Sequence, residues 1–427
     1  MSTALLTDHY ELTMVDAALQ DGTAYRPCVF ETFARDLPPG RGYGVVAGLG
    51  RLIEAIEAFR FDDEVLAHLD DNDVVSPPTL RALADVEFTG ELHAYREGEP
   101  FFPNSPVLTV TAPFIEGALL ETLVLSVLNY DSAVASAAAR MVSAAGGRTL
   151  LEFGGRRIHE QAAVAAARAA YLVGFTGTSN LEAGRRHGVP TLGTSAHSFT
   201  LLHDDEEHAF AAQVDGLGKT TTLLVDTYDI GEGLQRALRA GGTDLGGVRI
   251  DSGDLSAEAH RARRVLDEAG ATDTKIVLSG DLDEYRLAEL ADAPADGYGV
   301  GTSVVTGSGA PAAGFVYKLV ARARELGGEF EPVAKAGGVK ATTGKRKAAA
   351  RLLEEGTATA EHLRAFDRPA PAGARDLQVP VLVDGELRHD PDLEAIREHH
   401  RAARAELPDR ALDLHAEAPV LPTVHDL

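Results

Sequence analysis

The chain has 427 residues, of which 44% are hydrophobic, and it carries a formal net charge of −25 and a single cysteine, Cys28. This length allows a large core and two or three domains. The acidic balance argues against bulk binding to nucleic acid, and one cysteine excludes a disulfide framework and a cysteine-based zinc site. The N-terminus lacks a basic start followed by a long apolar stretch, and we find no uncharged apolar run of about 18 residues. We therefore expect a cytoplasmic protein with no nucleic-acid or membrane partner.

The first part of the chain predicts helices and strands without regular alternation. Apolar positions at helical spacing predict helices over 8–19 and 49–59. Residues rich in β-formers predict strands over 28–33, 88–95 and 107–110. Such a mixture is typical of an α+β layer, and we assign residues 1–113 to an N-terminal α+β domain.

A long Ala- and Leu-rich helical pattern over 119–145 is followed by regular alternation of strand and helix patterns. The near-continuous apolar runs predict strands at 150–153, 189–192, 222–225, 248–250, 275–278 and 297–300, with further strand patterns near Phe175 and Val316. Repeated βα units predict a parallel sheet buried on both faces. Their number favours an irregular parallel α/β barrel over 114–320, and a doubly wound sheet is the alternative.

The alternation stops after Tyr317, and a basic island follows. Five of the seven lysines lie within thirty residues, with two arginines beside them: Lys318, Lys335, Lys340, Lys345, Lys347, Arg346 and Arg351. In an acidic protein this island indicates either a place for phosphates or a solvated surface loop. Residues 379–383 with Asp384-Gly385 predict a hairpin strand, and 392–406 predict a helix. We expect the C-terminal segment, 321–427, to complete the first domain.

Polar residues and glycines follow each predicted strand of the barrel, where the active sites of parallel barrels lie. The segments are Glu152–Arg157, Gly174–Asn180, Ser195 with His197, Asp226–Asp229, Arg249–Asp254, Ser279–Asp283 and Gly299–Ser303. Each alone is weak, because an Asp after a strand is commonly a helix cap and a lone loop histidine commonly has no catalytic role. Together they place arginines, carboxylates, glycine-rich turns and one histidine on one rim.

This combination predicts an enzyme that acts on an anionic, phosphorylated substrate. Glycine-rich turns that open helices bind phosphate through backbone N–H groups, and arginine pairs with phosphate or carboxylate. Clustered aspartates suit Mg²⁺, and His197 would enter the chemistry. A non-catalytic sugar-phosphate or nucleotide-binding protein is the rival class, but it does not need a histidine among these carboxylates. An NAD-dependent dehydrogenase is disfavoured because no strand is followed by G-x-G-x-x-G.

Five motifs give the chain a resemblance to the nicotinate phosphoribosyltransferase family. They are Leu5–Met14, Phe175–Asn180, Gly193–Ser198, Val248–Asp254 and Gly299–Thr306. The resemblance implies a type II phosphoribosyltransferase fold, which is an α/β barrel with an N-terminal α+β domain. It also implies that nicotinate and phosphoribosyl pyrophosphate give nicotinate mononucleotide and pyrophosphate, with ATP hydrolysed through a transient phosphohistidine. The implied assembly is a homodimer or larger with shared active sites.

The resemblance also implies roles for individual residues. The phosphorylated histidine would be His197, with Asp226 on its other ring nitrogen and Asp251 on the ribose hydroxyls or on Mg²⁺. Phe153 and Tyr10 of the partner subunit would sandwich the pyridine ring. The remaining implied substrate-binding residues are Arg249 near the ring, Gly280, Asp281, Gly301 and Thr302 on the 5-phosphate, Arg156, Lys345 and Arg346 on pyrophosphate or ATP, Thr178 and Ser198 within the motifs, and, more weakly, Arg35.

Ser179 bears on the choice between acid and amide. The related nicotinamide enzyme has an aspartate at this position, and a serine removes a charge that would repel the carboxylate of nicotinate. Nicotinamide and quinolinate remain alternative substrates, although the quinolinate enzyme lacks the His197 motif. The segment Gly155–Glu160 departs from the family pattern, which leaves the loop near Arg157 unassigned. Residues after about 370 match poorly, and we assign them no function.

Overall fold

A computed structural model describes residues 2–335, 344–416 and 418–427. Contacts divide the chain into two compact units, the first formed by Met1–Ser136 with Ala312–Leu427 and the second by Ala137–Pro311. The boundaries predicted at 113/114 and 320/321 differ from this division for two reasons. Residues just after 113 continue the core of the first unit, and a strand that begins at Phe315 belongs to its sheet.

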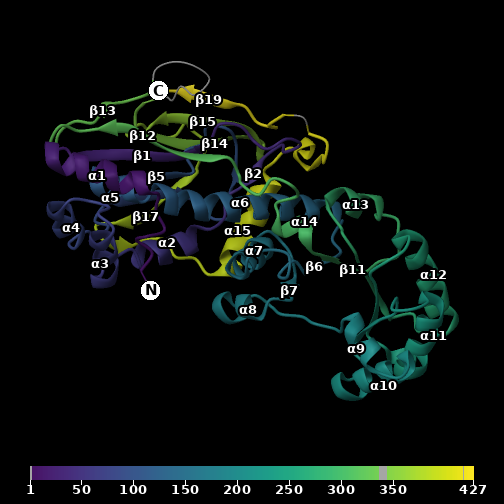
Figure 1. Ribbon diagram of the computed structural model, residues 1–427. Coiled ribbons are helices and arrows are strands. Elements are labelled where there is room, and N and C mark those ends of the chain that lie inside the picture. Colours follow the sequence, from purple (N-terminus) through teal and green to yellow (C-terminus); the bar gives the residue numbers. More distant parts are fainter. Residues whose placement is uncertain (1, 336–343, 417) are drawn as a thin grey trace. The chain divides into compact units, whose positions relative to one another are not determined.

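The first unit is built on a seven-stranded antiparallel sheet (Figure 1). Its order is β13 (Glu331–Pro332), β12 (Phe315–Arg322), β1 (Pro27–Ala34), β5 (Leu108–Pro113), β3 (Glu91–Tyr95), β17 (Gln378–Val383) and β18 (Glu386–Leu387). The C-terminal strand β17 pairs with β3, so the C-terminal segment completes the N-terminal α+β domain as predicted. The predicted hairpin at Asp384-Gly385 is confirmed. Both residues have positive φ, which a two-residue hairpin turn of this kind requires.

Two smaller sheets and a set of helices complete this unit. One sheet has the order β16 (Arg375–Asp376), β14 (Lys347–Glu354), β15 (Thr357–Ala365) and β19 (Thr423–Asp426), and the other pairs β2 (Gly44–Val45) with β4 (Pro100–Phe101). The helices are α1 (His9–Asp21), α2 (Leu49–Glu57), α3 (Asp63–Asp71), α4 (Pro77–Leu83), α5 (Phe114–Leu119) and α15 (Leu393–Ala405), with a 3₁₀ turn, η2 (Asp409–Leu412). One apolar core joins residues of helices α1, α2 and α5 to the seven-stranded sheet.

Helix α6 (Glu121–Ala144) contains the division between the two units. By length and composition alone it is long and apolar enough to cross a membrane, although we found no uncharged apolar run of that length in the sequence. Of its most apolar window, 67% is buried inside the protein, as in the core helix of a globular fold. The composition of α6 is therefore only weak evidence that this helix spans a membrane.

The second unit contains a six-stranded parallel sheet with helices in the connections (Figure 1). Its order is β7 (Gly177–Thr178), β6 (Thr149–Glu152), β11 (Gly297–Val300), β10 (Lys275–Ser279), β9 (Gly247–Ile250) and β8 (Thr222–Leu224). Its helices are α7 (Glu160–Leu172), α8 (Leu181–His187), α9 (His197–Leu202), α10 (Glu206–Leu217), α11 (Ile230–Gly241), α12 (Leu255–Glu268), α13 (Glu284–Glu289) and α14 (Thr302–Val305), with a 3₁₀ turn, η1 (Gly242–Asp244). The parallel α/β class is confirmed, and the sheet is a curled half-barrel with ends at β7 and β8.

Two predicted barrel strands are wrong. The run 189–192 forms no strand: only Thr191 makes a single bridge, to Thr178, and Leu192 is 45% exposed. Pro190 has no backbone N–H to donate to a neighbouring strand, so this apolar run does not form a buried strand. Val316 lies in β12 and pairs with Phe33, which places it in the antiparallel sheet of the first unit.

A buried ionic network in the first unit leads to a prediction about acid stability. The Glu99 carboxylate is almost fully buried and accepts two hydrogen bonds of 2.8 Å from the Arg375 guanidinium, and the His399 ring lies 2.9 Å away. Burial raises the pKa of Glu99, but the bonds from His399 and Arg375 outweigh it and hold the pKa at about 2. Because the folded pKa lies below the ordinary 4.5, this stabilisation is present above pH 4.5 and is lost as the pH falls towards 2.

We therefore expect Glu99→Gln to lower the free energy of unfolding at pH 7 by about 3 kcal/mol, as when one partner of a buried pair is removed. The dependence of stability on pH between 4.5 and 2 should also flatten. Urea unfolding followed at several pH values would measure both effects. Glu87→Gln, at an exposed pair with Arg60, should change neither quantity. An unchanged pH slope in Glu99→Gln would contradict the assignment.

Candidate active site

The carboxyl ends of the parallel strands meet along one edge of the second unit, where they surround a pocket of about 770 Å³. The residues that line it lie at or just after the ends of five different strands, or in the segment that leads into α9. Of the predicted residues it brings together Phe153, Arg156, Ser179, His197, Arg249, Asp251, Gly280, Asp281, Gly301 and Thr302. This set combines an aromatic ring, arginines, carboxylates, one histidine and glycine-rich turns, as the strand ends predicted.

His197 is the first residue of α9 and is not at the end of a strand. Its Nδ1 lies 3.1 Å from the Thr227 hydroxyl oxygen, and its Nε2 lies 3.9 Å from Asp226 Oδ1. The side chain is 41% exposed, so it faces the pocket while its ring is held from behind. A carboxylate beside one nitrogen favours the imidazole tautomer protonated on that nitrogen. The other nitrogen, Nδ1, then has a lone pair that faces the Thr227 hydroxyl here and would act as the nucleophile once that contact is released.

Asp226 is buried behind this histidine and does not line the pocket. Its Oδ2 accepts hydrogen bonds from the Asp251 backbone N–H at 3.0 Å and from the Ser252 hydroxyl at 2.6 Å. Its Oδ1 has no hydrogen-bond partner among the described residues and is the oxygen nearest His197. A buried carboxylate oxygen without a partner is costly. The nearest nitrogen, His197 Nε2 at 3.9 Å, is too far for a hydrogen bond here but could form one after a small approach.

Arg249 and Phe153 lie together on another wall of the pocket. The Arg249 guanidinium carbon is 5.9 Å from the centre of the Phe153 ring, and its Nη1 donates to the Thr194 hydroxyl at 3.2 Å. Burial lowers the pKa of Arg249, and the charges of Asp251 and Asp226 oppose that shift. Arginine stays protonated in proteins, so the wall offers a fixed positive charge beside an aromatic face, which suits an anionic ring.

Two glycine turns line the pocket. Gly280 has φ +113°, and a Cβ there would lie 2.5 Å from the Asp251 carbonyl oxygen, so no other residue fits this close approach. Asp281 also has positive φ, and Gly301 is the residue before α14. Backbone N–H groups of such turns point outwards and can bind phosphate oxygens.

Asp251 is the residue to test as a magnesium ligand. Its Oδ1 accepts a hydrogen bond from Ser279, and its side chain lines the pocket. The described residues contain no group of three or more His, Cys, Asp or Glu that could hold a metal ion. Magnesium in phosphate chemistry commonly uses one or two carboxylates with water and substrate phosphates. Asp251 fits that arrangement, with substrate oxygens completing the coordination.

Several predicted site residues are not among those that line this pocket. Ser198 follows His197 in α9 but does not line the pocket, and Thr178 is fully buried. Tyr10, Lys345, Arg346 and Arg35 belong to the first unit, and their placement relative to the pocket is not described.

Three basic side chains of the island form ion pairs or ring contacts within the first unit. Arg346 stacks 3.5 Å from the centre of the Phe366 ring and contacts Glu91. Lys347 forms a buried ion pair with Glu31, and Arg351 forms one with Glu361. These three positive charges already have partners within the protein and are less available to bind phosphate, whereas Lys345 is exposed. Lys340 lies outside the described residues.

Three residues for which we predicted no role from the sequence, Thr227, Thr194 and Asn180, lie in or next to the site. Thr227 stands in a strand-end segment that was singled out, so its location was predictable. Its contact with His197, 30 positions earlier, depends on the tertiary fold.

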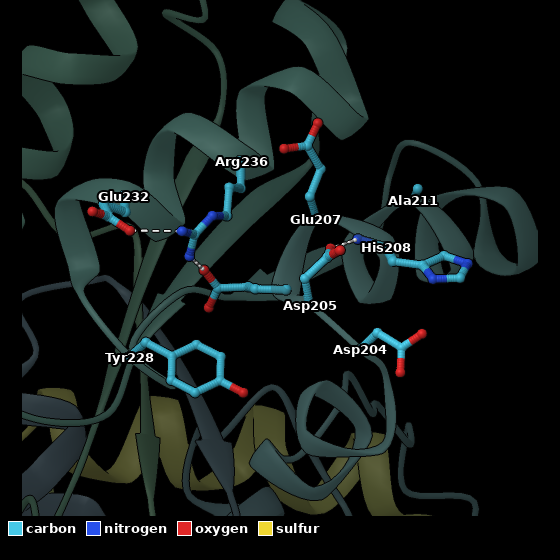
Figure 2. A pocket seen from close by; sticks show the side chains of 9 residues that line it. Asp204, Asp205, Glu207, His208, Ala211, Tyr228, Glu232 and Arg236 are labelled. Carbon is cyan, nitrogen blue, oxygen red and sulfur yellow. Dashed lines mark hydrogen bonds and ion pairs between the residues drawn. The ribbon is translucent and has the colours of Figure 1, made fainter.

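A second hollow in this unit, of about 590 Å³, has the opposite charge (Figure 2). It is lined by Asp204, Asp205, Glu206, Glu207, His208, Ala211, Tyr228, Glu232 and Arg236. Arg236 pairs there with Glu206 and Glu232 at 2.8 and 2.6 Å, so its charge is already compensated. An anionic substrate would be repelled from this hollow, so it does not compete with the first pocket for phosphates.

A parallel half-barrel with arginines and glycine turns at its strand ends, and a histidine at the start of α9 in the same pocket, defines an α/β enzyme of the phosphate-binding class. The chain also matches two family models. One is described as the nicotinate phosphoribosyltransferase N-terminal domain and covers residues 5–129, and the other as the nicotinate phosphoribosyltransferase family and covers residues 149–348. The chain therefore belongs to the nicotinate phosphoribosyltransferase family.

Individual relatives agree with this membership. The chain is 52% identical to nicotinate phosphoribosyltransferase pncB1 of Mycobacterium tuberculosis, over 98% of this chain and 94% of the relative. It is 40% identical to nicotinate phosphoribosyltransferase of Bacillus subtilis, over 75% of this chain and 67% of the relative. The crystal structure of human nicotinic acid phosphoribosyltransferase superposes with a TM-score of 0.86 at 27% identity, covering 98% of this chain and 97% of that one.

Proposed function

We propose that the protein joins nicotinate to phosphoribosyl pyrophosphate, forming nicotinate mononucleotide and pyrophosphate, and that ATP is hydrolysed through phosphorylated His197. The observation that carries this proposal is that, in a member of this family, one pocket brings together Phe153, Arg249, Asp251, His197 and the glycine turns. Each of these groups has a use in this reaction. A purely binding protein would have no need for a histidine held between Thr227 and a buried carboxylate.

The sugar phosphate would bind at the glycine turns. Backbone N–H groups at Gly280, Asp281, Gly301 and Thr302 would donate to its 5-phosphate, and Asp251 would accept from the ribose hydroxyls. In the transfer, the bond from the anomeric carbon to pyrophosphate breaks and a bond to the ring nitrogen of nicotinate forms. The Asp251 carboxylate would stabilise the positive charge that develops on the sugar. Mg²⁺, when bound, would neutralise charge on the departing pyrophosphate.

The histidine step would be a phosphoryl transfer. A ring nitrogen of His197 attacks the γ-phosphorus of ATP, an N–P bond forms, the bridging P–O bond breaks, and ADP leaves. Water later attacks the phosphohistidine and releases inorganic phosphate. Asp226 would hold the other ring nitrogen in its protonated form during the attack, which is the geometry its free Oδ1 offers.

The preference for the acid over the amide would come from the charges on the pocket walls. Ser179 is neutral and exposed at the rim, and Arg249 supplies a positive charge beside Phe153. A carboxylate on the ring would therefore be attracted, whereas an amide would gain less. Arg156 is also exposed at the rim and would contact pyrophosphate or ATP.

We further propose a cytoplasmic homodimer or larger assembly with shared sites. Tyr10 is 45% exposed on α1, although burial of its hydroxyl raises its pKa to about 12, with Glu121, Glu11 and Asp8 adding to the shift. The phenol therefore stays neutral at physiological pH. An exposed neutral aromatic ring of this kind suits stacking on a pyridine ring, as Tyr10 of the partner subunit would do.

The test is a product assay with phosphoribosyl pyrophosphate and Mg²⁺, offering nicotinate, nicotinamide or quinolinate, each with and without ATP. We expect nicotinate mononucleotide to form, and to form faster with ATP. Use of nicotinamide as readily as nicotinate would contradict the role given to Ser179 and Arg249. Absence of product from all three rings would overturn the proposed activity and favour the binding-protein alternative.

A further inference from the structure

A buried carboxylate beneath the pocket has no role in the reaction described above. Glu152 ends strand β6, is fully buried, and accepts hydrogen bonds from the Gly154 backbone N–H and from the Thr178 hydroxyl. Neither Glu152 nor Thr178 lines the pocket. Burial raises the pKa of Glu152, and these two hydrogen bonds oppose the shift. Burying a carboxylate costs free energy, so the contacts of Glu152 indicate which parts of the structure it positions.

The hydrogen bonds continue from Glu152 into the segment that carries Ser179. The Asn180 backbone N–H donates to the Thr178 hydroxyl oxygen at 3.0 Å, and the Asn180 side chain caps α8 by accepting from Ala183 N at 3.0 Å. The Ser179 backbone N–H donates to the Glu152 carbonyl oxygen at 2.9 Å. Ser179 is therefore fixed on both sides by contacts that lead back to Glu152.

The other hydrogen bond to Glu152 fixes the segment that carries Phe153. The Phe153 backbone N–H donates to the Val300 carbonyl oxygen at 2.8 Å, and a Cβ on Gly299 would lie 2.5 Å from the Phe153 ring. A Cβ on Gly154 would lie 2.7 Å from the Gly301 carbonyl oxygen. This packing leaves little space, so Gly154 cannot move without moving Phe153 relative to the glycine turn.

We propose that Glu152 and Thr178 are positioning residues that join the ring-stacking segment to the segment bearing Ser179, and so set the affinity and selectivity of the pyridine-ring site. The proposal rests on the proposed function and gives Thr178 a different role from the substrate contact expected from the sequence. Thr178 acts through its hydroxyl, which is the only group that bonds both Glu152 and Asn180 among these contacts. Neither residue lines the pocket that would hold the sugar phosphate and that contains His197.

The test compares Thr178→Val, which removes the hydroxyl at nearly constant shape, with Thr178→Ser, which keeps it. We expect Thr178→Val to raise KM for nicotinate by about tenfold, within the range for a lost buried hydrogen bond, while KM for phosphoribosyl pyrophosphate changes by less than about twofold. The preference for nicotinate over nicotinamide should fall, and ATP-dependent labelling of the protein should persist. Thr178→Ser should restore the wild-type constants.

Thr176→Val makes the same chemical change two positions earlier at an exposed residue and should leave all constants unchanged. If Thr178→Val does not fold, Glu152→Gln serves as the second variant. Its amide oxygen can still accept from Gly154, but its NH₂ group then faces the Thr178 hydroxyl, whose proton loses its acceptor. The same selective rise in KM for nicotinate is expected.

Equal constants in wild type and Thr178→Val would overturn the proposal, as would a parallel rise in both KM values or failure of Thr178→Ser to restore them. These outcomes require an active wild-type enzyme. A wild type that forms no product from nicotinate would instead overturn the proposed function, so the two failures are distinguishable.

Discussion

His197→Ala should abolish transfer of phosphate from ATP to the protein and make product formation equally fast with and without ATP. His197 is the histidine of the pocket, and its ring nitrogens face Thr227 and Asp226. Alanine has no nucleophile, so no phosphohistidine forms and its hydrolysis cannot assist turnover. The transfer itself should survive at the rate of the wild type without ATP, because Phe153, Arg249 and Asp251 remain. Incubation with γ-labelled ATP, followed by acid-sensitive loss of label, measures the first effect.

His208→Ala is the matched control for this experiment. His208 is an exposed histidine of the same unit and lines the acidic hollow (Figure 2). We expect it to leave both labelling and ATP stimulation unchanged. If His208→Ala removed the label and His197→Ala did not, the assignment of the phosphorylated residue would be wrong.

Asp226→Asn should produce the second large effect, a loss of about 10²- to 10⁴-fold in the rate of histidine phosphorylation, by analogy with an aspartate that orients a catalytic histidine. The amide oxygen can replace Oδ2 and keep the bonds from Asp251 N and Ser252. Its NH₂ group then points at His197 and favours the tautomer that lacks a proton on Nε2. The fold should remain intact, because the two accepted hydrogen bonds persist. Rapid-quench measurement of labelling gives the rate.

Asp229→Asn provides the comparison, because Asp229 caps helix α11 three residues further along the same segment. Asparagine caps helices about as well as aspartate, so stability and labelling should both stay at wild-type values. Wild-type labelling in Asp226→Asn would show that the carboxylate does not orient the histidine. A large loss of thermal stability in that variant would instead indicate a structural role for Asp226.

Local patterns in the sequence were sufficient for the class of the fold. Apolar runs with helices between them predicted the parallel strands that are observed within a residue or two, such as Gly297–Val300, because buried parallel strands need apolar residues on both faces. The same patterns failed at 189–192, where Pro190 and exposure leave only one bridge, and at Val316, whose partner strand is 283 positions earlier at Phe33. Strand composition does not encode which sheet a strand joins.

The sequence by itself determined most of the pocket, since any polar residue at the carboxyl end of a parallel strand must lie on the same edge. That rule placed Asp251, Gly280 and Gly301 correctly. Only the tertiary structure decided which of these residues face the pocket and which support it from below. Thr178 and Asp226 are buried, and their hydrogen bonds connect residues 26 and 25 positions apart, so burial and partner choice depend on packing that no local pattern specifies.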